Sequence, residues 1–313
     1  MRLTEGLRTW HRPLIWLAVL MTGTFLLSTG GLLFDDRTLL GEPIWLKPFK
    51  FSVSIAIYAV TLAWLVSLLS RGRRVAWWMG TITSAALVIE MAVMVAQVFR
   101  GRASHFNVAT PLDALGFEVM AVSIAILWLS NAVIAVFVLL ERSVDRPMTW
   151  ALRLGLLIAL AGMAVAFLMP QPTPDQLELM KQGIEVNYVG GHAVGVPDGG
   201  PGMPITHWST TGGDLRIPHF VGLHALQALP LLVLFLRRFS QRDVVTQTRL
   251  VLIASFAYAG LLALVLWQAL RGQPLVAPDA LTLGAFAALI LATAGSTAAV
   301  LRPRAEIREE VLV

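Results

Sequence analysis

Cysteine is absent from the 313-residue chain, and charged residues make up only 14% of it. The missing thiols exclude disulfides, iron–sulfur clusters, thiolate metal sites and cysteine nucleophiles. The charge content is also low, since a soluble domain usually carries about 25% charged residues. Apolar residues make up 57% of the chain, whose mean hydropathy is +0.72. This composition indicates a polytopic membrane protein.

Several common motifs are missing as well. The chain has no GxxxxGK[ST] phosphate loop, no GxGxxG, no HExxH and no GxSxG. Nucleotide-driven chemistry is therefore not expected. The net charge of +5 does not indicate nucleic-acid binding, because the arginines lie in short loops between apolar runs. The lipid bilayer is the expected partner.

Apolar runs of about 20 residues recur along the chain, which is the length that crosses about 30 Å of hydrocarbon. We expect an all-α transmembrane bundle, residues 1–313 forming a single domain. The first run is interpreted as a retained helix, because it lacks the small-residue cleavage site of a signal peptide. Eight spans are predicted: Pro13–Phe34, Pro48–Leu69, Val75–Phe99, Leu115–Leu140, Met148–Met169, Pro218–Leu236, Leu250–Leu270 and Leu281–Leu301.

The basic residues predict the orientation of these spans. Alternate segments hold fifteen arginines, against six basic residues in the remaining loops. Arginine and lysine are enriched on the cytoplasmic side of membrane proteins, so both termini are predicted to be cytoplasmic. The fifteen are Arg2, Arg8, Arg12, Arg71, Arg73, Arg74, Arg142, Arg146, Arg237, Arg238, Arg242, Arg249, Arg302, Arg304 and Arg308.

One loop, residues 170–217, is much longer than the others and is predicted to be extracytoplasmic. Thr173 as a cap and Pro174 at the first helical position predict a short helix near its start. The glycines and prolines that follow indicate irregular backbone. Such backbone near a membrane is tolerated where it lies on protein, so we expect the loop to fold over the outer mouth as a lid. A solvated connector is the simpler alternative.

Histidines are unevenly distributed. Five of the six fall in the outer loops or the outer part of a span, and we consider them candidate ligands for a metal or haem: His105, His192, His207, His219 and His224. The last two begin a membrane helix, but residues five apart lie about 140° apart around it, so they are not one chelating pair. Outer loops also collect polar residues simply because they are longer.

Glu90 and His224 lie at similar depths below the outer end of their spans, about 13 and 10 Å at the helical rise of 1.5 Å per residue. We therefore expect a Glu90–His224 contact in a buried polar site that includes Gln97 and Gln227, each on the same helix face as its neighbour. Pro230 is expected to kink the helix there. A neutral Glu90 bonded to backbone is the alternative.

Basic residues also gather at the outer end of the spans. We expect an anion-receptive mouth that could take a lipid headgroup, a carboxylate or a haem propionate, with His219 beneath the long loop. Interfacial ion pairing is the alternative. The mouth residues are Lys47, Lys50, Arg100, Arg102 and Arg216, and the supporting acids are Asp113, Glu118 and Asp214.

Three segments, GDLRIPHFVGLHALQALP, WLKPFKFS and RGRASHFN, resemble segments of a family of multi-pass bacterial membrane proteins. The resemblance covers most of the chain. It implies a helical protein of the bacterial cytoplasmic (inner) membrane, and it assigns no activity to any residue.

These observations favour a histidine and carboxylate site that opens to the extracytoplasmic side. The first hypothesis is a redox protein that binds haem or a transition metal (Cu, Zn or Fe), since imidazole suits all of these, with a membrane redox partner or subunit. The alternatives are a membrane enzyme that acts on a lipid-borne substrate at the outer leaflet, a proton-coupled transporter, and an accessory subunit.

Overall fold

The computed structural model describes residues 10–142 and 144–302. Within these ranges, eight helices are long and apolar enough to cross a membrane. They are α2 (Arg12–Phe34), α3 (Leu46–Ser67), α4 (Arg73–Arg100), α5 (Pro111–Leu140), α6 (Arg146–Ala164) with its 3₁₀ extension η1 (Val165–Leu168), α8 (Arg216–Phe239), α9 (Val244–Leu270) and α10 (Ala280–Leu301). The predicted all-α bundle of eight spans is confirmed.

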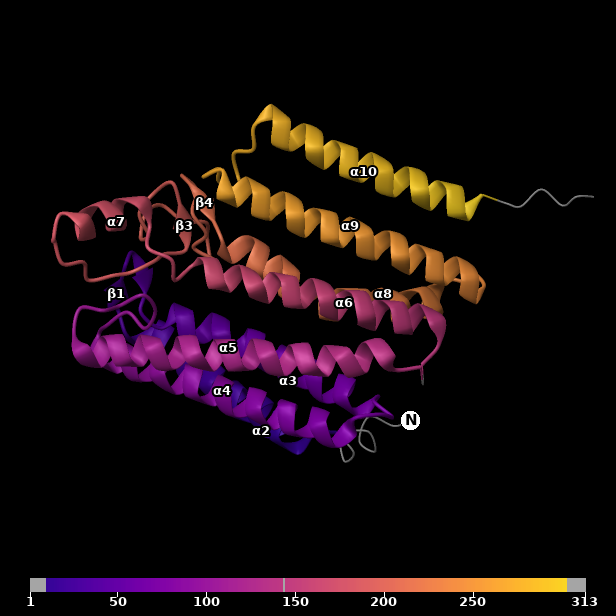
Figure 1. Cartoon of the computed structure of the whole chain (residues 1–313), viewed down its shortest axis with the longest axis horizontal. Coiled ribbons are helices and arrows are strands. Elements are labelled where there is room, and N and C mark those ends of the chain that lie inside the picture. The colour runs from indigo at the N-terminus through magenta and orange to yellow at the C-terminus, as the bar shows by residue number, and fades with distance from the viewer. Residues whose placement is uncertain (1–9, 143, 303–313) are drawn as a thin grey trace, which may run out of the picture.

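The spans lie roughly side by side along one axis in two groups (Figure 1). Helices α2 to α5 form one group, and α6, α8, α9 and α10 form the other. A single apolar core runs through both, with Leu14 and Leu62 in the first group and Leu226 and Val233 in the second. This core packs the two groups against one another, and the single domain stays a prediction.

Capping residues explain where the helices extend beyond the predicted spans. Thr110 caps α5 by accepting from the backbone N–H of Asp113, with Pro111 next to it in the first turn. Asp243 caps α9 in the same way through Thr246. Hydropathy detects only the apolar part of a helix, so it misses these polar first turns. Helix α8 continues through Pro230, which is buried inside it.

The long loop contains the expected short helix, α7 (Pro174–Lys181). Thr173 caps it, as the sequence predicts, and also forms a capping box with Gln176. The loop ends in the two-stranded antiparallel pair of β3 (Ala193–Val194) and β4 (Gly213–Asp214). A second antiparallel pair, β1 (Thr38–Leu39) and β2 (Glu42–Pro43), joins α2 to α3. We call this end of the bundle, with residues 35–45, 101–110, 169–215 and 271–279, the loop end.

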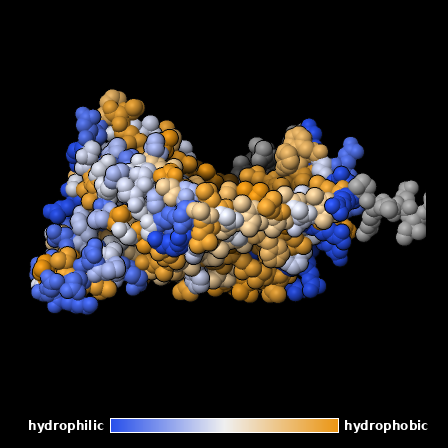
Figure 2. Space-filling model, turned by 90° about the horizontal axis from the view of Figure 1, so that it is seen from above, coloured by the Kyte–Doolittle hydropathy of each residue, from blue (hydrophilic) through white to orange (hydrophobic). Residues whose placement is uncertain are grey.

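The opposite end, here the arginine end, carries the short connections 68–72, 141–145 and 240–243. Figure 2 shows a broad apolar band between two more polar ends. Helix α10 contributes to the apolar surface, since Leu281, Ile290 and Leu291 are exposed. The chain is therefore an integral membrane protein with lipid as its natural surroundings. The predicted cytoplasmic location of the termini stays a prediction.

Helices α6 and α8 approach one another most closely at two glycines. A Cβ added to Gly162 would lie 2.5 Å from the Cα of Gly222, and one added to Gly222 would lie 2.4 Å from the Cα of Gly162. Small residues allow this approach between membrane helices, where close packing drives association. Gly162 also offers its carbonyl to His219 at 2.8 Å.

We predict that Gly162→Ala destabilises the protein by about 1–3 kcal/mol, the usual cost of overpacking, and this outweighs alanine's helix propensity. Gly284→Ala on α10 is the matched control, because nothing lies within 4 Å of its added Cβ. Thermal unfolding in detergent should show a lower Tm for Gly162→Ala and an unchanged or higher Tm for Gly284→Ala. Equal Tm values for the two variants would contradict the close α6–α8 contact.

Candidate functional site

Arg216, the first residue of α8, links three segments at the loop end. Its guanidinium binds both carboxylate oxygens of Asp214, with Nε 3.0 Å from Oδ1 and Nη2 2.7 Å from Oδ2. Nη1 lies 3.4 Å from Oε1 of Glu42 in β2, and Nη2 donates to the carbonyl of His207 at 2.5 Å. Asp214 is fully buried, so its charge depends on this partner.

Two lysines of α3 extend the cluster. The ammonium of Lys50 lies 3.3 Å from Oε2 of Glu42 and donates to the carbonyl of Thr206 at 3.0 Å. Glu42 is therefore shared between Lys50 and Arg216. Lys47, one turn earlier, lies within electrostatic range of Glu90, Glu42 and Arg216. Across residues 10–142 and 144–302, its ammonium makes no hydrogen bond and no ion pair.

Glu90 of α4 pairs with His105 rather than with His224. His105 Nε2 lies 3.3 Å from Glu90 Oε1, and Ser104 Oγ lies 2.9 Å from His105 Nδ1. The predicted Glu90–His224 contact is wrong because the loop after α4 folds back and brings His105 to the carboxylate. Glu90 is only 1% exposed, and its Oε2 has no hydrogen-bond partner. Burial and the nearby charge of Lys47 lower the pKa of His105, while Glu90 opposes them.

His192 and Asp198 form a second histidine–carboxylate pair, in the long loop. His192 Nδ1 donates to Asp198 Oδ2 at 2.9 Å, and the backbone N–H groups of His192 and Ala193 also donate to this carboxylate. Burial lowers the pKa of His192 to about 4, against the opposing effect of Asp198. Burial alone would raise the pKa of Asp198, but its hydrogen bonds hold it below its usual range. The imidazole is therefore neutral at pH 7, and Nε2 carries the free lone pair.

Lys47 connects the two pairs electrostatically, because its charge acts on both His105 and His192. The ring of Phe106 also lies between them, 4.8 Å from the ring of His192 and 6.0 Å from that of His105. We call Lys47, Glu90, His105, His192 and Asp198 the central cluster.

Gln97 and the remaining predicted mouth residues form a separate network. Asp113, fully buried, accepts from Gln97 at 2.9 Å and from Arg100 at 2.7 Å. Arg102 lies 3.8 Å from the same carboxylate. For Arg100 and Arg102, this arrangement matches the alternative interpretation of the mouth residues, which is interfacial ion pairing. Glu118 is exposed on α5.

The two histidines of α8 face different neighbours, as their spacing predicts. His219 donates through Nδ1 to the carbonyl of Gly162 at 2.8 Å and thus faces α6 rather than the mouth. The ring of His224 lies 4.3 Å from that of Phe220. Gln227, one turn further, lies 3.4 Å from Thr61 of α3.

The four residues expected in one buried site thus belong to three groups: Glu90 with His105, Gln97 with Asp113, and His224 with Gln227 on α8. Of the five candidate ligands, His105 has both ring nitrogens engaged. Among the residues that the structure describes, no three His, Cys, Asp or Glu side chains are placed to hold a metal ion. A haem or metal cofactor stays a prediction.

Sequence reasoning missed Glu42 and Asp198. Both lie in glycine- and proline-containing turns, GEP and VPDGG, which indicate loops and not sites. Their one detectable signal is that they are carboxylates in a chain with few charges. Asp198 pairs with His192 six residues away and Glu42 with Lys50 eight residues away, but each pair includes a turn residue, so no regular helix or strand period relates the two side chains.

The backbone around the cluster is strained. In the described part of the chain, four non-glycine residues have positive φ, and all of them lie at the loop end: Leu40, Phe106, Ile205 and His207. Such conformations cost about 1–3 kcal/mol each and gather at functional sites. Phe106 and His207 directly adjoin the charged network, since the His207 carbonyl accepts from Arg216.

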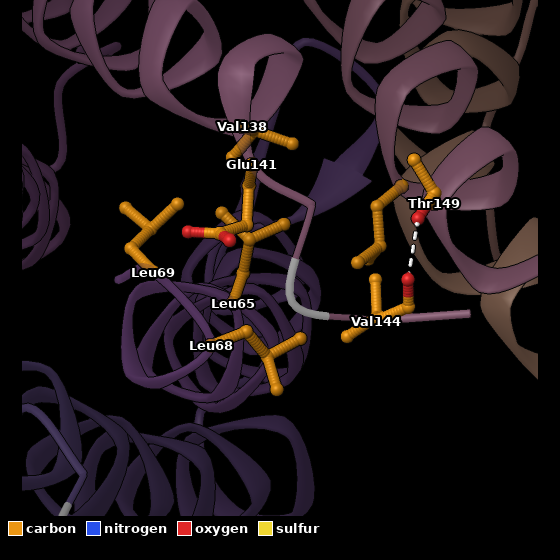
Figure 3. Close-up of a pocket in the computed structure, with 8 residues that line it drawn as sticks. Leu65, Leu68, Leu69, Val138, Glu141, Val144 and Thr149 are labelled. Atoms are coloured by element: carbon orange, nitrogen blue, oxygen red, sulfur yellow. Dashed lines mark hydrogen bonds between the residues drawn. The ribbon is translucent and has the colours of Figure 1, made fainter. Parts of the chain in front are cut away.

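A small pocket at the arginine end carries no comparable chemistry. Figure 3 shows Glu141 beside Leu65, Leu69 and Val138. The carboxylate of Glu141 accepts from the backbone and side chain of Ser70. The cavity volume is about 10 Å³, which is room for about one water molecule. We interpret this pocket as a structural junction between α3 and α5.

The fold and the site define a class: an eight-helix membrane protein with a cluster of paired histidines, carboxylates and cations at its loop end. Comparisons with protein-family models, curated proteins and solved structures gave no match for the chain. The function is therefore argued from the site itself.

We predict that acid weakens the fold through His192. Its folded pKa of about 4 is below the unfolded value of 6.5, so between these values the unfolded chain binds a proton that the folded chain does not. Stability is thus lost as pH falls through this window. From about pH 7 to about pH 5 the loss from this group is about 2 kcal/mol. Thermal unfolding should show a smaller acid shift in Tm for His192→Gln than for wild type, and an identical shift would refute the buried neutral imidazole.

Proposed function

We propose that the protein is a membrane enzyme that acts, at its loop end, on the anionic group of a lipid-borne substrate. One observation carries this proposal: His192 is held through Nδ1 by Asp198, and the charge of Lys47 acts on the same imidazole, while neither His192 Nε2 nor the Lys47 ammonium has a hydrogen-bond partner among the described residues. A positioned base and an uncommitted cation are the two parts that acyl or phosphoryl transfer requires.

The charges support an anionic substrate. Lys50 and Arg216 are satisfied by Glu42 and Asp214, whereas Lys47 has no carboxylate within ion-pair distance among the described residues. A phosphate or carboxylate of the substrate would form an ion pair with the Lys47 ammonium. Lys47 lies in the first turn of α3, at the level where lipid headgroups meet the ends of membrane helices. A lipid-borne substrate would reach it without leaving the bilayer.

The geometry of the His192–Asp198 pair supports base catalysis, because Asp198 holds Nδ1 and fixes the orientation of the ring. Nε2 of the neutral imidazole accepts a proton from water or a substrate hydroxyl, and the oxygen attacks the ester of the substrate. The imidazolium returns that proton to the leaving oxygen. Asp198 stabilises the imidazolium as it forms, as the carboxylate does in hydrolytic triads. Lys47 stabilises the negative charge that develops on the substrate.

The orientation is part of the proposal. Basic residues gather at the arginine end, so we place this end in the cytoplasm and the loop end outside the inner membrane of a bacterium. The substrate would then be an outer-leaflet lipid.

A histidine held by a carboxylate is also the usual arrangement of a metal ligand. Metal content and an optical spectrum of the purified protein are therefore measured alongside activity. A stoichiometric metal or haem that is lost in His192→Gln would make His192 a ligand and not a base.

We expect His192→Gln to abolish the lipid conversion. Cells that overproduce wild type should contain a changed lipid species by mass spectrometry, and cells producing His192→Gln at equal level should not. His207→Asn is the matched control, since asparagine tolerates the positive φ at that position and the His207 side chain makes no hydrogen bond or ion pair within the described part of the chain. A lipid profile that is identical in wild type, His192→Gln and cells without the protein would contradict the proposed function.

A further inference from the structure

An apolar groove runs between α2 and α3 within the membrane-spanning region. Its walls include Ala18 and Thr22 of α2 and Ala56, Ile57, Val60 and Thr61 of α3. Its volume is about 500 Å³, within the range of about 300–1,000 Å³ typical of small-molecule sites. The exposed fractions of Ile57 and Val60, 46% and 41%, show that the groove opens to the surroundings of the bundle.

The polar atoms of the groove are already satisfied. Thr22 donates to the carbonyl of Ala18 at 2.9 Å, and Thr61 donates to that of Ile57 at 2.8 Å. Each hydroxyl therefore donates its hydrogen bond to a backbone carbonyl of its own helix. The groove therefore offers apolar contact, which suits a hydrocarbon chain better than a polar solute.

The groove lies on the face of α3 that begins at Lys50, one turn after Lys47. On an α-helix, residues 7 and 11 positions apart lie within about 20° of one another around the axis, so Lys50, Ile57 and Thr61 share one face of α3. Ala56 and Thr61 lie about 9 and 16 Å below Lys50 at 1.5 Å per residue. One leaflet of a bilayer is about 15 Å of hydrocarbon, so a lipid chain that starts at the mouth reaches this depth.

We propose that the groove binds one hydrocarbon chain of an anionic lipid whose headgroup lies at Lys47. This inference rests on the proposed function for the position of the headgroup. The groove would select substrate by its chain, while the central cluster acts on its polar end. It also explains why α3 carries cations in its first turn and small or aliphatic residues two to four turns below.

Photocrosslinking tests the proposal. The protein is placed in nanodiscs of phosphatidylethanolamine with phosphatidylglycerol whose chain ends in a diazirine, and adducts are located by peptide mass spectrometry. We expect labelling of residues 15–22 and 56–61 to exceed that of the exposed face of α10 by about fivefold, a preference of about 1 kcal/mol. Val60→Phe and Ala56→Phe should reduce groove labelling to the α10 level, and the control Ala288→Phe should not.

Equal labelling of the groove and α10 in wild type would mean ordinary lipid contact and would overturn the proposal. Equal groove labelling by a diazirine phosphatidylcholine would also overturn it, because the headgroup must be anionic. The labelling needs no turnover, so His192→Gln should label like wild type. The experiment therefore tests lipid binding in the groove separately from the catalytic role of His192.

Discussion

Arg216 has to neutralise a carboxylate that no water reaches. Asp214 is fully buried between the long loop and α8, and removing one partner of such a pair usually costs about 3–5 kcal/mol. Arg216 meets this requirement and at the same time binds Glu42 and the carbonyl of His207. One guanidinium thus fixes the β1–β2 hairpin, the end of the long loop and the start of α8 relative to one another. Glu42, held by Arg216, in turn pairs with Lys50.

Unlike the Arg216–Asp214 pair, the central cluster contains polar atoms that have no partner in the described chain. Arg216, Lys50 and Asp113 have partners, whereas Glu90 Oε2 and the Lys47 ammonium have none in the described chain. A polar atom without a partner at low exposure costs free energy, and such atoms are often found where a function uses them. The strained backbone at Phe106 and His207 lies in the same place. These features together favour a binding and reaction site over a purely structural network.

The spans, their number and the cap of α7 could be predicted from sequence, because apolar run length and local capping are local properties. The pairing of the site residues could not. His105 lies in the loop that follows α4. Its distance in sequence from Glu90 does not show that this loop folds back onto the helix. Depth along a helix placed Glu90 and His224 at one level but said nothing about which helices are neighbours. The i and i+5 spacing of His219 and His224 did predict their separation, since helical geometry alone decides it.

The central claim is that Lys47 is the cation that receives an anionic lipid headgroup. Its most direct test is the affinity of the purified protein for phosphatidylglycerol, measured by native mass spectrometry on wild type, Lys47→Gln and Lys181→Gln. Lys181 is a suitable control because it lies exposed on α7, beside Glu178. The account predicts about tenfold weaker binding for Lys47→Gln, about 1.4 kcal/mol, and wild-type binding for Lys181→Gln. Equal affinity in all three proteins would contradict it.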